Sequence, residues 1–223
     1  NIIRRGISGS FKEDRIMITI IDTGIANVAS IQNMIYRCGS VAKIVTSPDE
    51  AINSEKMILP GVGSFDAGMK KIIENGWIDF LDDYVLKEKK IIFGICLGMH
   101  FLTHSSEEGK LKGLSYVDAE TVRFDKTKMN EDNKIPHMGW NEVNRLKSSK
   151  LFSDTLTEER FYFVHSYHVN CNNNDEVLTS TNYGYEFHSA FKKENIIGVQ
   201  YHPEKSHKFG FRFFKNFISL KND

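Results

Sequence analysis

Apolar residues in the first half of the chain fall into short runs, and amphipathic stretches separate these runs. Residues 17–22 read MITIID, and the later runs VAKIVT, EKMILP and KIIFGI have the same character. Aliphatic runs of this length, bounded by glycine, proline or charged residues, are typical of buried strands. We therefore predict strands over residues 17–22, 41–46, 55–60 and 90–95.

Apolar residues at helical spacing lie between these strands. Segment 27–39 ends in glycine and predicts one helix, and segment 65–88 predicts a helical stretch that Gly76 interrupts. A further helix is expected directly after Cys96. Strands that alternate with helices indicate an α/β fold with a mostly parallel central sheet and flanking helices. The carboxyl ends of its strands then meet at one edge, where such sheets bind ligands.

The pattern changes after about Gly113 to short, partly alternating apolar segments separated by turn residues. Such segments are typical of antiparallel hairpins, which we expect beside the parallel sheet. The chain closes with FGFRFFKNFISL at 209–220, which predicts a helix packed on the sheet. The strands of the second half are expected at 119–125, 141–146, 160–169, 176–183, 187–194 and 195–201.

The first sixteen residues differ from the rest of the chain. NIIRRGISGSFKEDRI contains arginines and a Gly-Ser break, and it has no continuous apolar segment of the kind that a secretory signal needs. Met17 begins the first clean strand. We interpret 1–16 as a leader or an added segment and 17–223 as a single domain, because no linker divides it.

The composition indicates which kinds of partner and which cellular compartment to expect. The 223 residues contain 29 Lys+Arg and 29 Asp+Glu, so the bulk charge favours neither nucleic acid nor an anionic membrane surface. The apolar runs are far shorter than a membrane span. The three cysteines are widely separated and lack zinc-type spacing. We expect no disulfide framework, no metal or other cofactor, and a cytoplasmic location.

Cys96 stands between Gly94 and Gly98 where an apolar run ends, in the sequence IIFGICLGMH. A strand that turns sharply into a helix exposes its last side chain above the sheet, and small neighbours let a substrate approach. The serine version of this turn is the nucleophile elbow of hydrolases, and a helix amino terminus also favours a thiolate. The alternative is a small core residue, as free cysteines often are. This stretch alone leaves both interpretations open.

A second loop offers the partners that a cysteine nucleophile needs. In GVQYHPEKS another apolar strand ends shortly before His202, and Glu204 follows two residues later. A base holds the thiolate and protonates the leaving group, and a carboxylate orients that base. We therefore predict a triad of Cys96, His202 and Glu204, each placed after a strand.

A third stretch, PGVGSF at 60–65, also follows a strand directly. Gly61 and Gly63 allow backbone N–H groups to point into a cavity, as an oxyanion hole requires. Two glycines after a strand are also what an ordinary tight turn needs. PGVGSF therefore indicates an oxyanion hole only in combination with the motifs around Cys96 and His202.

Together these motifs resemble the class I, triad-type glutamine amidotransferases. The sequences GICLG, PGVGSF and YHPEKS carry the resemblance, which runs from Met17 to the carboxyl terminus. Within that family, IPHMGWN and FYFVHSYH resemble the glutaminase subunit of imidazole glycerol phosphate synthase. The combination is specific although no single motif is.

The resemblance implies a glutaminase reaction. Cys96 attacks the side-chain amide of L-glutamine, His202 protonates the departing ammonia, and water then releases glutamate. The resemblance implies an oxyanion hole formed by Val62, Gly63 and Leu97. It implies glutamine contacts at Gly61, His100, Glu108, Ser166 and Tyr167.

The resemblance also implies a partner protein. In the family, ammonia passes to a cyclase subunit, a TIM barrel that makes imidazole glycerol phosphate and an aminoimidazole carboxamide ribotide in histidine biosynthesis. The matched interface positions are Asn27, Trp140, Tyr162 and Lys205. Trp140 and Tyr162 belong to the residue types enriched at interfaces, and core aromatics with a bonded polar tip are the other interpretation.

Two positions depart from the family pattern. His100 stands where members usually have glutamine. It could contact glutamine, alter its affinity or titrate near neutral pH. Ala26 stands where glycine is more common, in the loop DTGIAN, which faces the cyclase in the family.

Three alternatives stay open from the sequence. A paralogous glutaminase subunit would supply ammonia to a sugar-modifying synthase instead. A free-standing cysteine hydrolase would need no partner. A non-catalytic subunit that only binds the cyclase is disfavoured, because all three triad residues are present.

Overall fold

The computed structural model describes residues 17–24, 26–152 and 158–221. The segment interpreted as a leader, 1–16, lies outside these residues. Within the described ranges, no helix combines the length and the apolar character needed to cross a bilayer.

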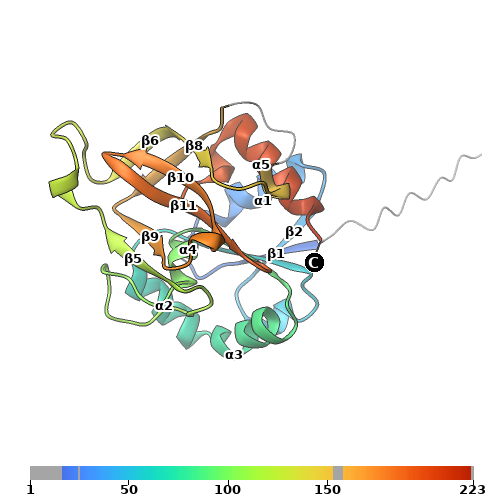
Figure 1. Cartoon of the computed structure of the whole chain (residues 1–223). Helices are drawn as coiled ribbons and strands as arrows, with labels where there is room; N and C mark the ends of the chain where they lie inside the picture. The colour runs from blue at the N-terminus through green and yellow to red at the C-terminus, as the bar shows by residue number, and fades with distance from the viewer. Residues whose placement is uncertain (1–16, 25, 153–157, 222–223) are drawn as a thin grey trace, which may run out of the picture.

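A parallel sheet forms the centre of the molecule (Figure 1). The sequence-based strand predictions of the first half are confirmed, because the strands observed there are β1 (Met17–Ile21), β2 (Val41–Val45), β3 (Lys56–Gly61) and β4 (Ile91–Cys96). Their order in the sheet is β2-β1-β3-β4, and all pair in parallel.

One strand of the second half also joins this parallel sheet. The strand β12 (Ile196–Val199) pairs in parallel with β4 and antiparallel with β11 (Tyr185–Lys193). The expectation that every strand after Gly113 belongs to an antiparallel set is therefore wrong for β12. The pairing places the loop after β12 beside the carboxyl end of β4.

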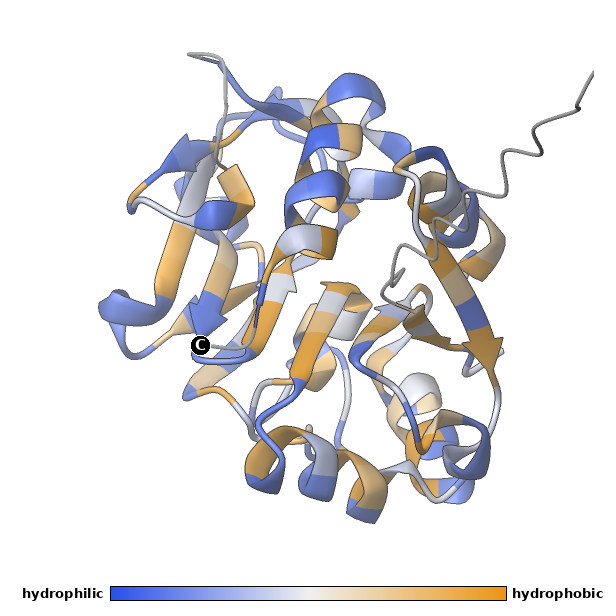
Figure 2. Ribbon diagram, turned by 90° about the vertical axis from the view of Figure 1, so that its right-hand side faces the viewer, coloured by the Kyte–Doolittle hydropathy of each residue, from blue (hydrophilic) through white to orange (hydrophobic). Residues whose placement is uncertain are grey.

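Helices cover both faces of the sheet (Figure 1). Strand side chains alternate between faces. Phe93 therefore packs in a core with α1 (Val28–Arg37) and α5 (His207–Ser219), whereas the adjacent Ile92 packs in a second core with α2 (Phe65–Glu74) and α3 (Trp77–Asp82). Hydrophobic residues accordingly dominate the central strands, while the helices carry both hydrophobic and hydrophilic residues (Figure 2). The predicted break at Gly76 separates α2 from α3. A π-helical turn at Asp83–Lys87 follows α3, and α4 spans Leu97–Phe101.

Antiparallel strands extend the sheet on one side and form a small second sheet. β10 (Val177–Tyr183) and β11 form a hairpin that continues the main sheet towards β7 (Asn144–Arg145), and β9 (Tyr167–Cys171) joins β5 (Ala119–Arg123) to β11. β6 (His137–Glu142) pairs separately with β8 (Arg160–His165).

Two of the predicted strand ranges are wrong in detail. The range 141–146 contains the end of β6 and all of β7, because the chain changes pairing partner at Val143, from β8 to β10. The range 160–169 is two strands that meet at Ser166, because β8 pairs with β6 whereas β9 pairs with β5 and β11. Such changes of partner depend on distant segments, and local periodicity does not record them.

Candidate active site

Cys96 occupies a sharp turn from β4 into α4. It is the last residue of the strand, and its backbone has φ +54° and ψ −112°, which is uncommon for a residue other than glycine. The flanking glycines make this turn possible. A Cβ atom on Gly98 would lie 1.7 Å from the Leu59 carbonyl oxygen, and one on Gly94 would lie 2.6 Å from the Gly98 carbonyl oxygen. The strand-to-helix elbow expected from the sequence is therefore present.

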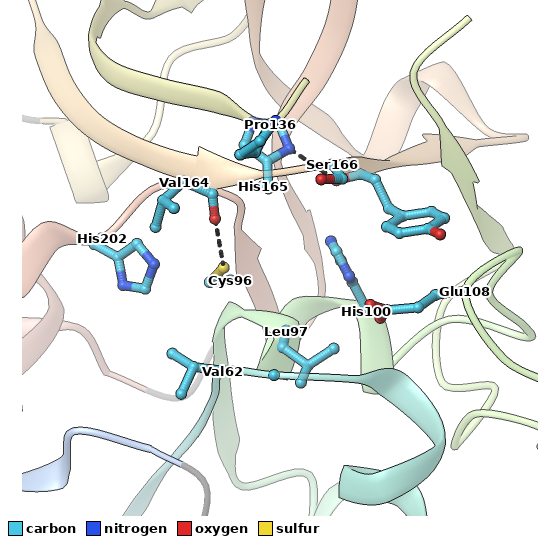
Figure 3. A pocket seen from close by; sticks show the side chains of 12 residues that line it. Val62, Cys96, Leu97, His100, Glu108, Pro136, Val164, His165, Ser166 and His202 are labelled. Atoms are coloured by element: carbon cyan, nitrogen blue, oxygen red, sulfur yellow. Dashed lines mark hydrogen bonds between the residues drawn. The ribbon is translucent and has the colours of Figure 1, made fainter. Parts of the chain in front are cut away.

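His202 and Glu204 form a buried pair next to this turn. His202 Nδ1 lies 2.7 Å from Glu204 Oε1, and both side chains are at most 4% exposed. His202 follows β12, the neighbour of β4, and its ring lies beside the Cys96 sulfur in Figure 3. The parallel pairing of two strands distant in sequence thus brings the three residues of the predicted triad together.

The electrostatics of this group favour a charged imidazole. Burial alone would lower the pKa of His202, but the Cys96 thiolate and the Glu204 carboxylate outweigh that effect and raise the pKa to about 10. His202 Nε2 is buried and has no hydrogen-bond partner among the described residues. Because Nδ1 is bonded to Glu204, Nε2 is the atom that can exchange a proton with the Cys96 sulfur.

A cavity of about 270 Å³ opens beside Cys96 and His202 (Figure 3). Its wall contains most of the predicted oxyanion and glutamine contacts, namely Val62, Gly63, Leu97, His100, Glu108, Ser166 and Tyr167. The backbone at Gly63 is left-handed, with φ +93°. Pro136, Val164 and His165 also line the cavity, and the sequence analysis missed them because their motifs were assigned only as family markers.

Gly61 does not line this cavity, although the sequence analysis placed it among the glutamine contacts. It pairs in register with Cys96 at the ends of β3 and β4. A Cβ atom there would lie 3.0 Å from Leu97 Cβ and 3.2 Å from the Gly98 nitrogen. Gly61 therefore makes room for the start of α4, and it lines a smaller recess with Asn27 and Lys205.

Glu108 supplies a carboxylate to the cavity wall. Its Oε2 accepts a hydrogen bond of 2.9 Å from the backbone N–H of Phe65, the first residue of α2. Burial raises the pKa of Glu108 above its ordinary value, and that N–H partly offsets the effect. A half-buried carboxylate held in this way suits a cationic group such as the ammonium of an amino acid.

His100 is buried and uncharged. It is 4% exposed, and burial lowers its pKa to about 4. The hypothesis that His100 titrates near neutral pH is therefore wrong, because a desolvated imidazole favours its neutral form. His100 Nε2 lies 2.8 Å from Gln200 Oε1.

Further histidines form a buried network behind the cavity. His165 Nδ1 donates to the Tyr167 carbonyl oxygen at 2.7 Å, so His165 Nε2 accepts from His137 Nδ1 at 2.9 Å. The ring of Phe124 packs 5.1 Å from His165 and 4.9 Å from His168, between centroids. Burial lowers the pKa of His137 and His168 to about 4 and that of His165 well below its ordinary value. All three rings are therefore neutral at pH 7.

These histidines are expected to make the protein sensitive to acid. Between pH 6.5 and 4 the unfolded chain takes up protons that the folded protein does not, so the free energy of unfolding falls as the pH falls. His100, His137 and His168 each contribute to this loss, because burial lowers the pKa of each imidazole in the folded protein. His202 does not offset this loss of stability. Its pKa is higher in the folded protein, and below pH 6.5 the imidazole is charged in both the folded and the unfolded chain, so it adds no further stabilisation as the pH falls.

Urea unfolding at pH 7, 6 and 5 measures this loss. His100→Gln should reduce the slope of the free energy of unfolding against pH, because it removes one of the buried neutral imidazoles. A free energy of unfolding that stays constant from pH 6.5 to 5 would contradict the prediction.

The predicted interface residues lie next to one another, although they come from β6, β8 and the segments that follow β1 and β12. Trp140 is 40% exposed, so the alternative of a core aromatic is wrong for it. Its ring meets Tyr162 edge to face at 6.4 Å, and Lys205 Nζ lies 6.0 Å from the Tyr162 ring centre. Asn27 is exposed, begins α1 as its N-cap, and shares the small recess with Lys205. The sequence analysis missed His207, which stacks on Trp140 at 5.4 Å.

The sequence of this chain is similar to a known family and to named relatives. Residues 19–220 match the family model "Glutamine amidotransferase class-I". The chain is 52% identical to "Imidazole glycerol phosphate synthase subunit HisH 2" of Methanococcus maripaludis, over 91% of this chain and 98% of that protein. It is 45% identical to the protein of the same name from Pseudomonas aeruginosa, over 92% of this chain and all of that protein.

Solved structures of low sequence identity share the fold. A glutamine amidotransferase crystal structure superposes with a TM-score of 0.71 at 16% identity, over 91% of this chain and 99% of that one. A glutamine amidotransferase from Thermotoga maritima gives a TM-score of 0.62 at 15% identity, over 92% and 81%. Because the family model spans nearly the whole chain and relatives are about half identical to it, the chain belongs to the class I glutamine amidotransferases.

Proposed function

We propose that the chain is the glutaminase subunit of an imidazole glycerol phosphate synthase. The observation that carries the proposal is one cavity that joins the Cys96 thiol, the His202–Glu204 pair and the Glu108 carboxylate. The relatives whose names state this subunit align with more than nine tenths of the chain, which supports the proposal.

The first half of the reaction follows from the paired thiolate and imidazolium. Cys96 attacks the side-chain carbonyl carbon of L-glutamine, and the carbonyl oxygen becomes an oxyanion. Leu97 begins α4, and N–H groups in the first turn of a helix have no acceptor within that helix. We assign the oxyanion to the Leu97 N–H and to the Val62–Gly63 stretch. Loss of one such donor lowers the rate by about 10²–10³-fold.

The second half uses His202 as acid and then as base. The proton on Nε2 passes to the leaving nitrogen, and ammonia departs from the thioester. Water, deprotonated by the neutral imidazole, then releases glutamate and restores the thiol. Glu204 keeps the proton on Nδ1 at 2.7 Å, so that Nε2 serves both transfers.

We assign glutamine recognition to the remaining wall of the cavity. Glu108 is placed to pair with the ammonium group of the amino acid, and Ser166 and Tyr167 lie along the same wall. His100 faces the cavity with a neutral ring. Family members usually have a glutamine side chain at the position of His100. Because that side chain and the His100 ring are both neutral, the departure leaves the charge of the proposed site unchanged.

We further propose that a cyclase subunit receives the ammonia in a heterodimer. The candidate contact surface is formed by Asn27, Trp140, Tyr162 and Lys205, next to the cavity. Tryptophan and tyrosine are enriched at protein interfaces and among their energetically dominant residues, which supports Trp140 and Tyr162 as contacts.

A second function has one observation in its favour. The names of the relatives from M. maripaludis and P. aeruginosa both carry the number 2, as names of second copies do. A second glutaminase subunit is free to feed another synthase, for example one that aminates a sugar. The departures at His100 and Ala26 are compatible with this paralogous subunit.

Glutamate release from L-glutamine tests the proposal. We expect the purified chain to be slow alone and strongly stimulated by a cognate cyclase with its ribonucleotide. Full activity without a partner would identify a free-standing hydrolase. Activity that responds only to a sugar-modifying synthase would identify the paralogous subunit, and silence with every partner would indicate a non-catalytic subunit.

Trp140→Ala is expected to weaken cyclase binding by about 30-fold, since a central interface tryptophan typically contributes about 2 kcal/mol. Titration of the glutaminase rate with cyclase gives the dissociation constant. Tyr36→Ala is the matched control, because Tyr36 is an aromatic residue 48% exposed near the far end of α1. Equal dissociation constants for the wild type and Trp140→Ala would rule out this surface.

A further inference from the structure

Gln200 lies between the Cys96 thiol and His100. Its side chain is fully buried, in the short segment that joins β12 to His202. Its Nε2 lies 3.9 Å from Cys96 Sγ, and its Oε1 lies 2.8 Å from His100 Nε2. One amide group thus connects the nucleophile to His100, one of the two positions at which this chain departs from the family pattern.

The orientation of this amide follows from the tautomer of His100. His100 Nδ1 is buried and has no hydrogen-bond partner within the described part of the chain. A buried N–H without an acceptor is more costly than a bare acceptor nitrogen, so the proton belongs on Nε2. His100 Nε2 then donates to Gln200 Oε1. The amide NH₂ must consequently point towards Cys96.

The opposite side of the sulfur has a different partner. Cys96 Sγ lies 3.9 Å from the Val164 carbonyl oxygen, which can only accept, and Figure 3 shows this contact as a dashed line. The carbonyl therefore bonds the neutral thiol and loses its bond when the proton moves to His202. The Gln200 N–H becomes a stronger donor when its acceptor is charged. The two contacts thus act in opposite directions on ionisation of the sulfur.

We propose that Gln200, held by His100, is a positioning residue that donates a hydrogen bond to the Cys96 thiolate and thereby favours ionisation of the nucleophile. The role in turnover rests on the proposed glutaminase function, but the effect on the thiolate does not. A glutamine at position 100 would also offer an N–H to Gln200 Oε1. The departure at His100 is therefore chemically conservative.

Several other titratable groups face the sulfur or its cavity, and the test must separate Gln200 from them. They are His202 and Glu204 after β12, His100 of α4, His165 and Tyr167 at the β8–β9 junction, and Glu108. Gln200 itself does not titrate. Its replacement by an uncharged side chain therefore changes the donor without adding or removing a charge.

Alkylation of Cys96 by iodoacetamide, measured across pH, tests the proposal. The rate at the Cys96 peptide is followed by mass spectrometry, which distinguishes it from Cys38 and Cys171. Gln200→Met keeps the volume of the side chain and removes the N–H. We expect the alkylation profile to move to higher pH by about one pH unit, the effect of one hydrogen bond to a charged group, and the rates to converge with the wild type at high pH.

Three further variants make the result specific. His100→Leu removes the anchor of the amide and should shift the pH profile in the same direction, whereas His100→Gln should restore it. Gln32→Met is the matched control, because Gln32 is the only other glutamine of the chain and its Nε2 donates to the Ala42 carbonyl oxygen. The glutaminase kcat of Gln200→Met should fall with KM little changed.

Two results would overturn the proposal. One is an alkylation profile of Gln200→Met that coincides with the wild type, and the other is a reduction by the same factor at every pH, as a structural defect would give. If Gln200→Met does not fold, the alkylation profile of His100→Leu is compared with the wild type in the same way, and the same two results would overturn the proposal. Because iodoacetamide reacts without glutamine, the alkylation result holds even if glutamate release is absent.

Discussion

Cys96→Ala is expected to lower the rate of glutamate release by about 10⁴-fold or more. The variant removes the atom that forms the thioester, whereas the His202–Glu204 pair and the cavity wall remain. Without the thioester, only direct attack of water on the amide is left, assisted by the oxyanion donors. The rate is measured on the complex with cyclase and ribonucleotide, in which the wild type is expected to be fastest.

Cys171→Ala provides the control for this substitution. Cys171 is also a buried cysteine, 4% exposed, and burial raises the pKa of its thiol to about 12. It lies in β9 and does not line the cavity. Its replacement should leave the rate within a small factor of the wild type. Residual activity of Cys96→Ala close to that of Cys171→Ala would refute the assignment of the nucleophile.

Gly98→Ala is expected to lower the free energy of unfolding by more than about 3 kcal/mol, above the usual range for an overpacked core. The new Cβ would lie 1.7 Å from the Leu59 carbonyl oxygen and 2.7 Å from its carbon. Both are backbone atoms of β3, so no side-chain rotation relieves the clash. Urea unfolding followed by circular dichroism measures the loss.

Gly61→Ala is the milder counterpart of this variant. Its Cβ would lie 3.0 Å from Leu97 Cβ, 3.1 Å from the Phe101 ring and 3.2 Å from the Gly98 nitrogen, so a shift of α4 by a few tenths of an ångström relieves these contacts. We expect a loss of about 1 kcal/mol. Equal stability losses for the two variants would show that the severity of the clash between β3 and α4 does not determine the loss.

The same packing explains how Cys96 keeps a strained backbone. A positive φ at a residue other than glycine costs about 1–3 kcal/mol and persists only where the surroundings enforce it. Cys96 is paired with Gly61 on β3, and β12 pairs with the other edge of β4. Neighbours on both sides therefore hold the elbow and aim the thiol at the cavity.

The sequence alone determined the elements of the first half of the chain and the chemical groups of the site. Runs such as 17–22 and 90–95 were recognised because buried strands and amphipathic helices impose local periodicities. The pattern failed at Val143 and Ser166, where strands change partners, and at β12, whose neighbours lie far away in the chain. Strand order depends on which distant segments bury each other's surfaces.

Tertiary structure decided what the recognised residues do. Desolvation made His100 a neutral partner of Gln200, and close packing made Gly61 a spacer below α4. The solvent exposure of the Trp140 side chain showed that it is not a core aromatic residue. Residue types and their spacing specify which reactive groups are available. The protonation states, contacts and exposure of those groups arise only when strands from both halves of the chain pair and exclude water.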